Sequence, residues 1–250
     1  MSARPSSDPS QRTALVTGGG RRIGRAIAED LALRGWRVAI HCNTSKNEAE
    51  DVAQGIRDAG GEAAVFAADL ADIEAVEGLL PSVTGALGPV TLLVNNASVF
   101  WDDAAESVNA EIWDKQLAIN LRAPIFLTRD FARLLPPGVE GLVVNIVDQR
   151  VLKPDAEFVS YTISKSALWT ATQTLAQALA PDVRVNAIGP GPTLPNPHDG
   201  EAGFEREIAQ ETLLGRSVDL ADFGRTIRYL WQTRSLTGQF IALDSGQHLT

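Results

Sequence analysis

Cysteine and histidine are scarce in this sequence, and their scarcity excludes two kinds of site. Cys42 is the only cysteine, so the chain cannot form an internal disulfide, and a reducing compartment is expected. The three histidines, His41, His198 and His248, lie far apart in the sequence and, with a single cysteine, offer no metal-ligand spacing. We therefore expect neither a disulfide framework nor a metal site.

Long apolar runs and an excess of positive charge are also missing. No apolar segment reaches the length of a membrane-spanning helix, and residues 1–12 are rich in Ser and Pro without the apolar core of a signal peptide. We interpret residues 1–12 as a disordered tail on a cytoplasmic protein. The formal net charge of −9 argues against nucleic acid or an anionic membrane as the main partner, while a local basic pocket for a phosphorylated cofactor remains open.

What the sequence does contain is an alternation of strand-like and helix-like segments, with 44% hydrophobic residues to build a core. Strands are expected at residues 13–17, 36–42, 63–68, 90–94, 142–147, 183–188 and 240–243. Helices are expected at residues 22–34, 48–59, 72–87, 108–135 (interrupted or kinked at Pro124), 161–180 and 220–231. This order predicts a single α/β domain over residues 13–250, with a Rossmann-like, doubly wound parallel sheet and helices on both faces. A substrate loop rich in Gly and Pro is expected at about residues 189–215.

A glycine-rich turn follows the first expected strand and opens the first expected helix, with the sequence Thr17-Gly18-Gly19-Gly20-Arg21-Arg22-Ile23-Gly24. Glycines let the backbone approach a pyrophosphate, and a helix N-terminus favours its negative charge. We therefore predict cofactor contacts at Gly18, Arg22, Ile23 and Gly24. A plain strand–helix turn is the alternative interpretation of the same residues.

The end of the second expected strand bears on which nicotinamide cofactor is bound. NAD enzymes usually carry a carboxylate near this point to bind the ribose diol, and residues 41–46 contain none. The donors available for a 2′-phosphate are His41, Asn43, Thr44, Ser45 and Lys46, which Arg22 can join. We predict NADPH rather than NADH, the alternative being a solvated polar turn.

Two further strand ends carry candidate cofactor residues. Asp69-Leu70 follows the third expected strand, where an acid can accept the adenine amino group. Asn95-Asn96-Ala97 follows the fourth, where it can position the ribose and the backbone of the cofactor. Asp and Asn also bond local backbone in turns, so ordinary turn chemistry is the alternative for both.

The pair Tyr161 and Lys165 lies one turn apart on a face of an expected helix. An ammonium near a phenol lowers the phenol's pKa, and a tyrosine tuned in this way can exchange a proton near neutral pH. Asp148 follows the fifth expected strand, where a ketone reductase needs a donor for the developing alkoxide. An ionised carboxylate only accepts hydrogen bonds and would repel that charge. An ordinary amphipathic pair and a capping carboxylate are the alternatives.

In their order along the chain, these motifs resemble the short-chain dehydrogenase/reductase family, and the resemblance spans about residues 13–249. The motifs are the glycine-rich turn, Asp69, Asn95-Asn96-Ala97, Asn120, Tyr161 with Lys165, Gly189-Pro190-Gly191 and Thr237-Gly238-Gln239. Within the family the chain looks like the pteridine reductase and dihydromonapterin reductase branch. This similarity is carried by Arg22 in place of a glycine, Ser98 after Asn96-Ala97, Phe100, Asp148 in place of the usual serine, and the ending at residues 244–249.

The resemblance implies an NADPH-dependent reductase that transfers hydride to a ring carbon–nitrogen double bond of a dihydropterin. Dihydromonapterin, dihydrobiopterin and dihydrofolate are the substrates it suggests. Tyr161 would donate the proton together with Asp148, and Lys165 would bind the nicotinamide ribose. Asn120 resembles the family residue that holds a proton-relay water at a helix distortion.

The resemblance also implies contacts for three further residues. Gly191 would contact the cofactor, Ser98 would bond the pterin edge or the cofactor, and Phe100 would stack on the pterin. Core packing or a lid cover is the alternative for Phe100. A homo-oligomer, a tetramer or a dimer formed through the long helices, is expected by analogy. The alternative functions are a carbonyl or enoyl reductase and a non-catalytic NADP(H)-binding regulator.

Overall fold

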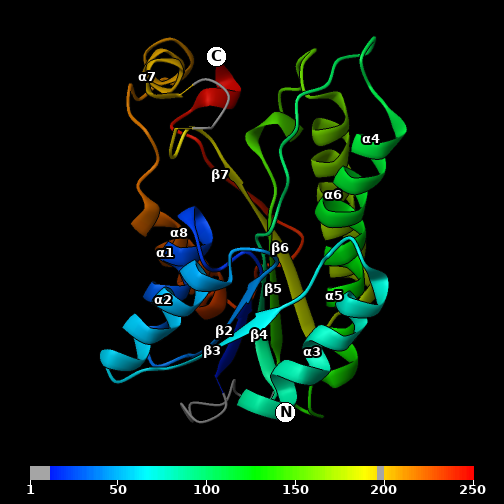
Figure 1. Ribbon diagram of the computed structural model, residues 1–250, viewed down its shortest axis with the longest axis vertical. Helices are drawn as coiled ribbons and strands as arrows, with labels where there is room; N and C mark the ends of the chain where they lie inside the picture. The colour runs from blue at the N-terminus through cyan, green and yellow to red at the C-terminus, as the bar shows by residue number, and fades with distance from the viewer. Residues whose placement is uncertain (1–11, 196–199) are drawn as a thin grey trace.

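One parallel sheet of seven strands organises the structure, a computed structural model that describes residues 12–195 and 200–250. The strand order is β3-β2-β1-β4-β5-β6-β7, and every adjacent pair is parallel (Figure 1). The strands are β1 (Thr13–Val16), β2 (Arg37–Cys42), β3 (Glu62–Ala67), β4 (Val90–Asn95), β5 (Gly141–Ile146), β6 (Val183–Pro190) and β7 (Phe240–Leu243). The prediction of an α/β, doubly wound fold is confirmed.

Helices cover both faces of this sheet (Figure 1). One layer contains α1 (Arg22–Ala32), α2 (Lys46–Asp58) and α8 (Leu220–Gln232). The other contains α3 (Ile73–Leu87), α5 (Ala123–Leu134) and α6 (Val159–Ala178), with α4 (Ala110–Leu117) before α5 and packed on α6. Successive β1 residues face opposite layers, with Ala14 and Val16 in the first core and Leu15 in the second, as the period of two in a strand requires. Burial on both faces explains why the central strands are mostly apolar.

The expected helix at residues 108–135 is one run of three parts. Between α4 and α5 lies η2 (Ala118–Arg122), a π-helical segment that widens the helix by one residue per turn. Pro124 sits in the first turn of α5, where a missing N–H costs little, so the distortion comes before the proline and not at it.

The expected loop at residues 189–215 is only partly a loop. β6 continues to Pro190, and α7 (Gly200–Glu211) occupies much of the remainder, so the prediction was wrong there. The Gly- and Pro-rich composition ends near Gly203, and Glu, Arg, Ala and Gln in the following stretch favour a helix. Residues 1–11 and 196–199, which include most of the expected tail and His198, lie outside the described residues.

The topology indicates that the functional site lies at one edge of the sheet. Strand order reverses between β1 and β4, and ligands in such sheets bind beyond the carboxyl ends of the strands at that point. Two short 3-10 segments, η3 (Gln149–Val151) and η4 (Gln247–Leu249), belong to the loops at this edge. Within residues 12–195 and 200–250, no helix has the length and apolar character needed to cross a membrane.

Candidate active site

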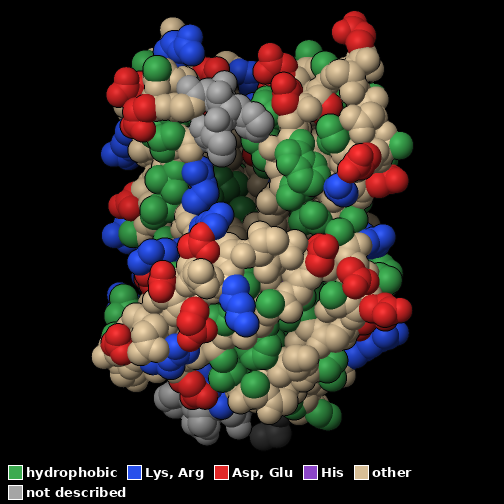
Figure 2. All heavy atoms as spheres, in the orientation of Figure 1, with side chains coloured by type: hydrophobic (Ala, Val, Ile, Leu, Met, Phe, Trp, Pro, Cys, Tyr) green, Lys and Arg blue, Asp and Glu red, His purple; other side chains and the backbone are tan. Residues whose placement is uncertain are grey.

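A cleft of about 1140 Å³ opens at the carboxyl edge of the sheet. The face drawn in Figure 2 is hollowed in its upper half, and basic side chains lie along one edge of the hollow. The predicted site residues that line the cleft are Gly18, Arg22, Ile23, Gly24, His41, Asn43, Ser45, Asp69, Leu70, Asn96, Ala97, Ser98, Phe100, Asp148, Tyr161, Lys165 and Gly191. Thr44 and Asn120 do not line it. In the described part of the chain, no three His, Cys, Asp or Glu side chains gather as a metal site.

The glycine-rich turn is locked to the end of β4. The Thr17 hydroxyl accepts hydrogen bonds from the backbone N–H groups of Asn96 and Ala97, both at 2.9 Å, and Asn96 Nδ2 donates to the Thr17 carbonyl at 2.8 Å. A Cβ on Gly24 would lie 2.2 Å from the Gly18 oxygen, so only glycine allows α1 to approach the turn. The first N–H groups of α1 therefore point from a fixed position into the cleft, where an anion can bind them.

His41 stabilises the glycine-rich turn by hydrogen bonding. Its Nδ1 accepts a hydrogen bond from the Gly18 N–H at 3.1 Å, so its Nε2 carries the proton and donates to the Ala68 carbonyl at 3.0 Å. Burial lowers the pKa of His41, so the ring is neutral near pH 7. Both ring nitrogens are engaged within the protein, which disagrees with the prediction that His41 offers a donor to a 2′-phosphate.

The polar residues after β2 divide between the cleft and the solvent. Asn43 and Ser45 line the cleft, whereas Thr44 is exposed outside it. Arg21, which the sequence analysis did not single out, lines the cleft and pairs with Glu48. The sequence feature that could have identified Arg21 is its position in the glycine-rich turn, directly before α1.

Arg22 lies across the cleft and not towards the residues after β2. Its guanidinium donates to the carbonyls of Pro195 at 2.8 Å and Leu194 at 3.1 Å. Its φ of 50° lies in the left-handed region, which explains why a glycine is common at such a position. Arg22 was expected to join a 2′-phosphate site. In the structure its hydrogen bonds instead connect the segment after β6 to the glycine-rich turn.

Two other candidate cofactor residues, Asp69 and Gly191, make close contacts within the protein. Asp69 Oδ1 accepts the backbone N–H of Ala71 at 2.9 Å, which is the turn chemistry considered as its alternative. A Cβ on Gly191 would lie 2.7 Å from the Asp244 Cα, so glycine is required where β6 passes the C-terminal segment.

Asp148, Tyr161 and Lys165 meet at the centre of the cleft. The Tyr161 phenol donates to Asp148 Oδ2 at 2.8 Å, and Asp148 Oδ1 accepts the backbone N–H of Arg150 at 2.9 Å. Asp148 is therefore both a capping carboxylate of η3 and a partner of the tyrosine. Lys165 Nζ donates to the Ile146 carbonyl at 2.8 Å and lies 5.7 Å from the centroid of the Tyr161 ring.

The electrostatics of this group differ from the prediction. Burial raises the pKa of Tyr161 well above its usual value of ten, and the Asp148 charge and hydrogen bond raise it further. Burial also raises the pKa of the Asp148 carboxyl and lowers the pKa of Lys165 to about 8. The prediction that Lys165 lowers the tyrosine pKa was wrong, because desolvation and the carboxylate dominate where the ammonium lies beside the ring and not at the hydroxyl.

Asn120 lies in the π-helical segment, so the expected helix distortion is present. Its Oδ1 accepts from Ser98 Oγ at 3.1 Å and from the Val99 N–H at 2.9 Å. Its Nδ2 donates to the Val99 carbonyl at 2.9 Å and to Ser164 Oγ at 3.2 Å. These four bonds use the whole side chain. Asn120 thus anchors the loop after β4 to α6, and Ser98 points its hydroxyl at Asn120.

Phe100, which was predicted to stack on a pterin, belongs to an aromatic stack within the protein that was not predicted. Its ring stacks on Phe158 with centroids 4.1 Å apart and planes 18° apart, and it meets Tyr161 edge-on at 4.7 Å. The Arg150 guanidinium lies over the other ring of the stack, 5.2 Å from the Phe158 centroid. Phe158 precedes α6 with a φ of 54°, and nothing in its local sequence indicates this conformation.

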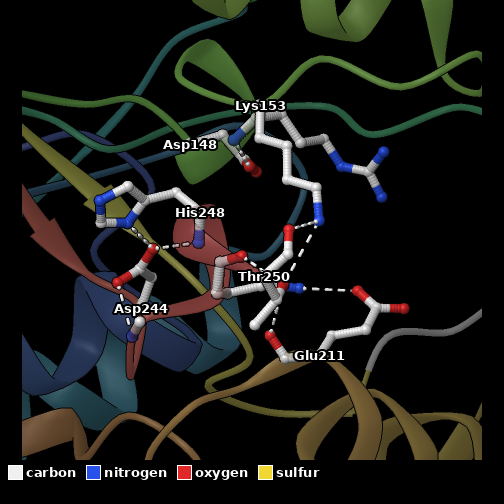
Figure 3. A network of polar contacts seen from close by, with 9 residues as sticks. Asp148, Lys153, Glu211, Asp244, His248 and Thr250 are labelled. Carbon is white, nitrogen blue, oxygen red and sulfur yellow. Dashed lines mark hydrogen bonds and ion pairs between the residues drawn. The ribbon is translucent and has the colours of Figure 1, made fainter.

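The far wall of the cleft comes from α7, which lies within the predicted substrate loop at about residues 189–215, and from the C-terminal segment, for which no site residue was predicted. Glu207 and Glu211 on α7 and Gln247 on η4 all line the cleft. Figure 3 shows the backbone carbonyl of Glu211 next to Thr250, with Lys153 on the other side of Thr250. Lys153 Nζ donates to the Thr250 carbonyl at 2.5 Å, which joins the loop after β5 to the C-terminal segment.

Comparison with known proteins agrees with this architecture. A sequence model of the short chain dehydrogenase family matches residues 12–202. FolM alternative dihydrofolate reductase 1 from Brucella canis, a crystal structure with NADP, is 52% identical, with a TM-score of 0.94 over 96% of this chain and 95% of that chain. Its counterpart from Brucella suis, also with NADP, is 52% identical, with a TM-score of 0.94 over 97% of both chains. L-xylulose reductase from Bos taurus is 35% identical over 243 residues, 94% of this chain and 96% of that protein. On these grounds the chain belongs to the short-chain dehydrogenase/reductase family of oxidoreductases.

Proposed function

We propose that this protein is an NADPH-dependent reductase that transfers hydride to a ring carbon–nitrogen double bond of a dihydropterin. The observation that carries the proposal is the carboxylate of Asp148, which is half-buried in the cleft and accepts a hydrogen bond from the Tyr161 hydroxyl at 2.8 Å. A group that holds and delivers a proton suits a ring nitrogen, which gains one when its neighbouring carbon gains hydride. The likeness to two structures that carry the name dihydrofolate reductase supports the same substrate class.

The residues present fit NADPH. The cleft offers the N-terminus of α1 and the guanidinium of Arg21 at one end, and residues 43–46 contain no carboxylate that would repel a 2′-phosphate. Asn43 and Ser45 supply donors beside that position. The solved relatives from Brucella contain NADP, which supports the same cofactor here.

When bound, NADPH supplies the hydride and with it both electrons. Lys165, whose ammonium donates to the Ile146 carbonyl, would hold the nicotinamide ribose, while the hydrogen bond between Ser98 and Asn120 fixes the loop after β4. A proton must reach the ring nitrogen as the carbon–nitrogen π bond becomes a new N–H bond and C–H bond. The Asp148–Tyr161 pair supplies that proton, with Tyr161 as donor and Asp148 as the acid that makes the phenol competent.

The protonation state of Asp148 decides whether the phenol can act. An ionised Asp148 raises the pKa of Tyr161 and holds its proton, whereas a protonated Asp148 removes that charge. Burial raises the pKa of Asp148, which makes its protonated form accessible at higher pH than for an exposed carboxyl. The productive state of the pair therefore carries both protons and gives one to the substrate.

Initial rates of NADPH oxidation test the proposal with dihydromonapterin, dihydrobiopterin, dihydrofolate and a simple ketone as substrates. Turnover of at least one dihydropterin above the ketone is the expected result. Faster turnover of the ketone would instead establish a carbonyl reductase. Tight NADPH binding without turnover of any substrate would establish a non-catalytic regulator.

A further inference from the structure

A second cavity, which we call the distal cavity, has a volume of about 320 Å³ and lies away from the catalytic cleft. Arg12 and Trp36, which line it, directly precede β1 and β2, and Leu92 lies near the start of β4. Because every strand is parallel, this is the edge of the sheet where strands begin, whereas the catalytic cleft lies where they end. None of its described lining residues also lines the cleft. Its volume reaches that of small-molecule sites, which begin at roughly 300 Å³.

The floor of the distal cavity is apolar. Four of its lining side chains are at most 4% exposed and belong to the core under α1 and α8, namely Leu31, Trp36, Leu92 and Ile227. The indole of Trp231 on α8 meets the ring of Trp36 edge-on, with centroids 4.7 Å apart. The two helices that carry this wall, α1 and α8, pack on each other (Figure 1). A flat apolar group can therefore lie against a tryptophan pair that is already held in place.

The charged groups of the distal cavity are all positive. Arg12, Arg34 and Arg228 line it, and its described lining residues include no carboxylate. Arg228 pairs with Asp30, but in the described part of the chain no side chain or carbonyl pairs with the guanidinium of Arg12 or Arg34. The Nε of Arg12 is buried without a hydrogen-bond partner, which is costly for a charged donor. An anion beside this guanidinium would offset that cost.

These arginines are not needed to cap the helices that end at the distal cavity. Arg184, which does not line it, donates to the carbonyls of Leu230 at 2.7 Å and Trp231 at 3.2 Å at the end of α8. At the end of α1, the backbone N–H groups of residues 34–36 donate to the carbonyls of the last turn. The negative ends of both helices are thus satisfied by other donors, which leaves the guanidinium groups of the cavity available for a ligand.

We propose that the distal cavity binds a small aromatic carboxylate, with its ring against the tryptophan pair and its carboxylate paired with Arg12 and Arg34. The forked donors of a guanidinium match the two oxygens of a carboxylate. In a chain with a net charge of −9, a cavity lined by arginines is a local positive field that favours an anion over a neutral ligand. The site is independent of the proposed reaction, because it lies at the other edge of the sheet.

Calorimetric titration of the whole chain with 2-naphthoate tests the site, with 2-naphthamide as a neutral ligand of the same shape. We expect a Kd on the order of 0.1–1 mM for 2-naphthoate and binding at least roughly tenfold weaker for the amide. Added salt should weaken binding of the carboxylate and not of the amide, since it screens the charge. Saturating NADPH should leave the Kd for 2-naphthoate unchanged, because the proposed cofactor site is in the catalytic cleft.

Substitutions of single arginines locate the binding. Arg12→Gln and Arg34→Gln each remove one guanidinium and should each weaken 2-naphthoate binding by roughly three- to tenfold, with no change for 2-naphthamide. Arg34 is exposed, so its variant keeps the test decisive if Arg12→Gln unfolds. Arg25→Gln is the matched control, because it removes the same charge from an exposed position of α1 outside the cavity and should leave the Kd unchanged.

Three results would overturn the proposal. One is equal affinity for the carboxylate and the amide, and another is displacement of 2-naphthoate by NADPH, which would place the ligand in the catalytic cleft. The third is a Kd that changes no more in Arg12→Gln and Arg34→Gln than in Arg25→Gln. None of these results bears on dihydropterin reduction, which the oxidation of NADPH measures separately.

Discussion

The Tyr161 hydroxyl is bonded to a carboxylate, Asp148 Oδ2, at 2.8 Å, and this contact changes what the tyrosine does. An isolated Tyr–Lys pair would favour the phenolate, but here burial and Asp148 favour the phenol. In the proposed reaction, the proton therefore stays on the pair until a substrate nitrogen takes it. Two substitutions and one pH profile follow from this arrangement.

Replacing Tyr161 by phenylalanine removes the proton donor and keeps the ring that meets Phe100 edge-on. We expect Tyr161→Phe to lower kcat on a dihydropterin by roughly 10²- to 10⁴-fold, the usual contribution of a positioned acid. NADPH affinity, measured by fluorescence titration, should stay close to that of the unmodified protein. Turnover that survives intact would remove Tyr161 from the acid role.

Asp148 should give the pH profile of kcat an alkaline limb. Its carboxyl has a raised pKa and acts in its protonated form, so kcat should fall as pH rises through that pKa and approach a plateau below it. In Asp148→Ser this limb should disappear, dihydropterin turnover should drop, and activity on a carbonyl substrate should appear, since a hydroxyl can donate to a carbonyl oxygen. A serine variant as active as the parent on dihydropterins would contradict the argument from carbon–nitrogen reduction.

The expected cofactor preference depends on the absence of a carboxylate after β2. Asn43→Asp places one at a position that lines the cleft, and repulsion should weaken NADPH binding by roughly tenfold or more while NADH binding stays the same or improves. Titration of both cofactors with both proteins measures this. Thr44→Asp, at an exposed position outside the cleft, is the matched control. Tighter binding of NADH than NADPH by the unmodified protein would refute the preference itself.

The site could be predicted from sequence where its residues are neighbours along one element or end adjacent strands. Tyr161 and Lys165 share a helix face by spacing alone, and Asn96 and Gly18 follow the ends of two strands that pair in the sheet. The pKa of Tyr161 could not be predicted, because it depends on burial and on the hydroxyl's bond to Asp148, and neither is a property of the local spacing.

Long-range partners were missed for a similar reason. Gln247 and Glu207 lie forty positions apart and meet because α7 folds over the cleft, and the Gly- and Pro-rich stretch before α7 favoured a loop prediction. Phe158 joins Phe100 only through a left-handed backbone turn that no side-chain pattern indicates. The fold could be predicted from the periodicity of the sequence. The outer wall of the cleft could not, because it depends on how segments far apart in the sequence pack together.

Two glycines provide a matched test of the turn that would bind the pyrophosphate. Gly24→Ala would place a Cβ 2.2 Å from the Gly18 oxygen, a backbone atom, so the turn must move. We expect a loss of about 1–3 kcal/mol in the free energy of unfolding and weaker NADPH binding. Gly55→Ala in α2 meets no atom within 4 Å and should stabilise the protein by up to about 1 kcal/mol. Urea unfolding curves measure both, and equal effects of the two changes would contradict the packing argument.

His41 should make the same turn sensitive to acid. Its pKa in the folded protein lies below the ordinary value of 6.5, so the unfolded chain binds more protons as the pH falls below about 6.5. Stability that is present at pH 7 is therefore lost as pH falls from that value towards the lowered pKa. Protonated Nδ1 can no longer accept from the Gly18 N–H, so NADPH affinity should fall in the same window.

His41→Gln removes the titrating group while keeping one donor and one acceptor. We expect a Tm below that of the unmodified protein at pH 7.5, because the two ring hydrogen bonds are imperfectly replaced, at a cost of about 1–3 kcal/mol. Between pH 7.5 and 5.5 the Tm of the variant should fall less steeply, because one proton-linked step is missing. Parallel Tm profiles for the two proteins would show that His41 does not charge in this range and that the turn owes its acid sensitivity to other groups.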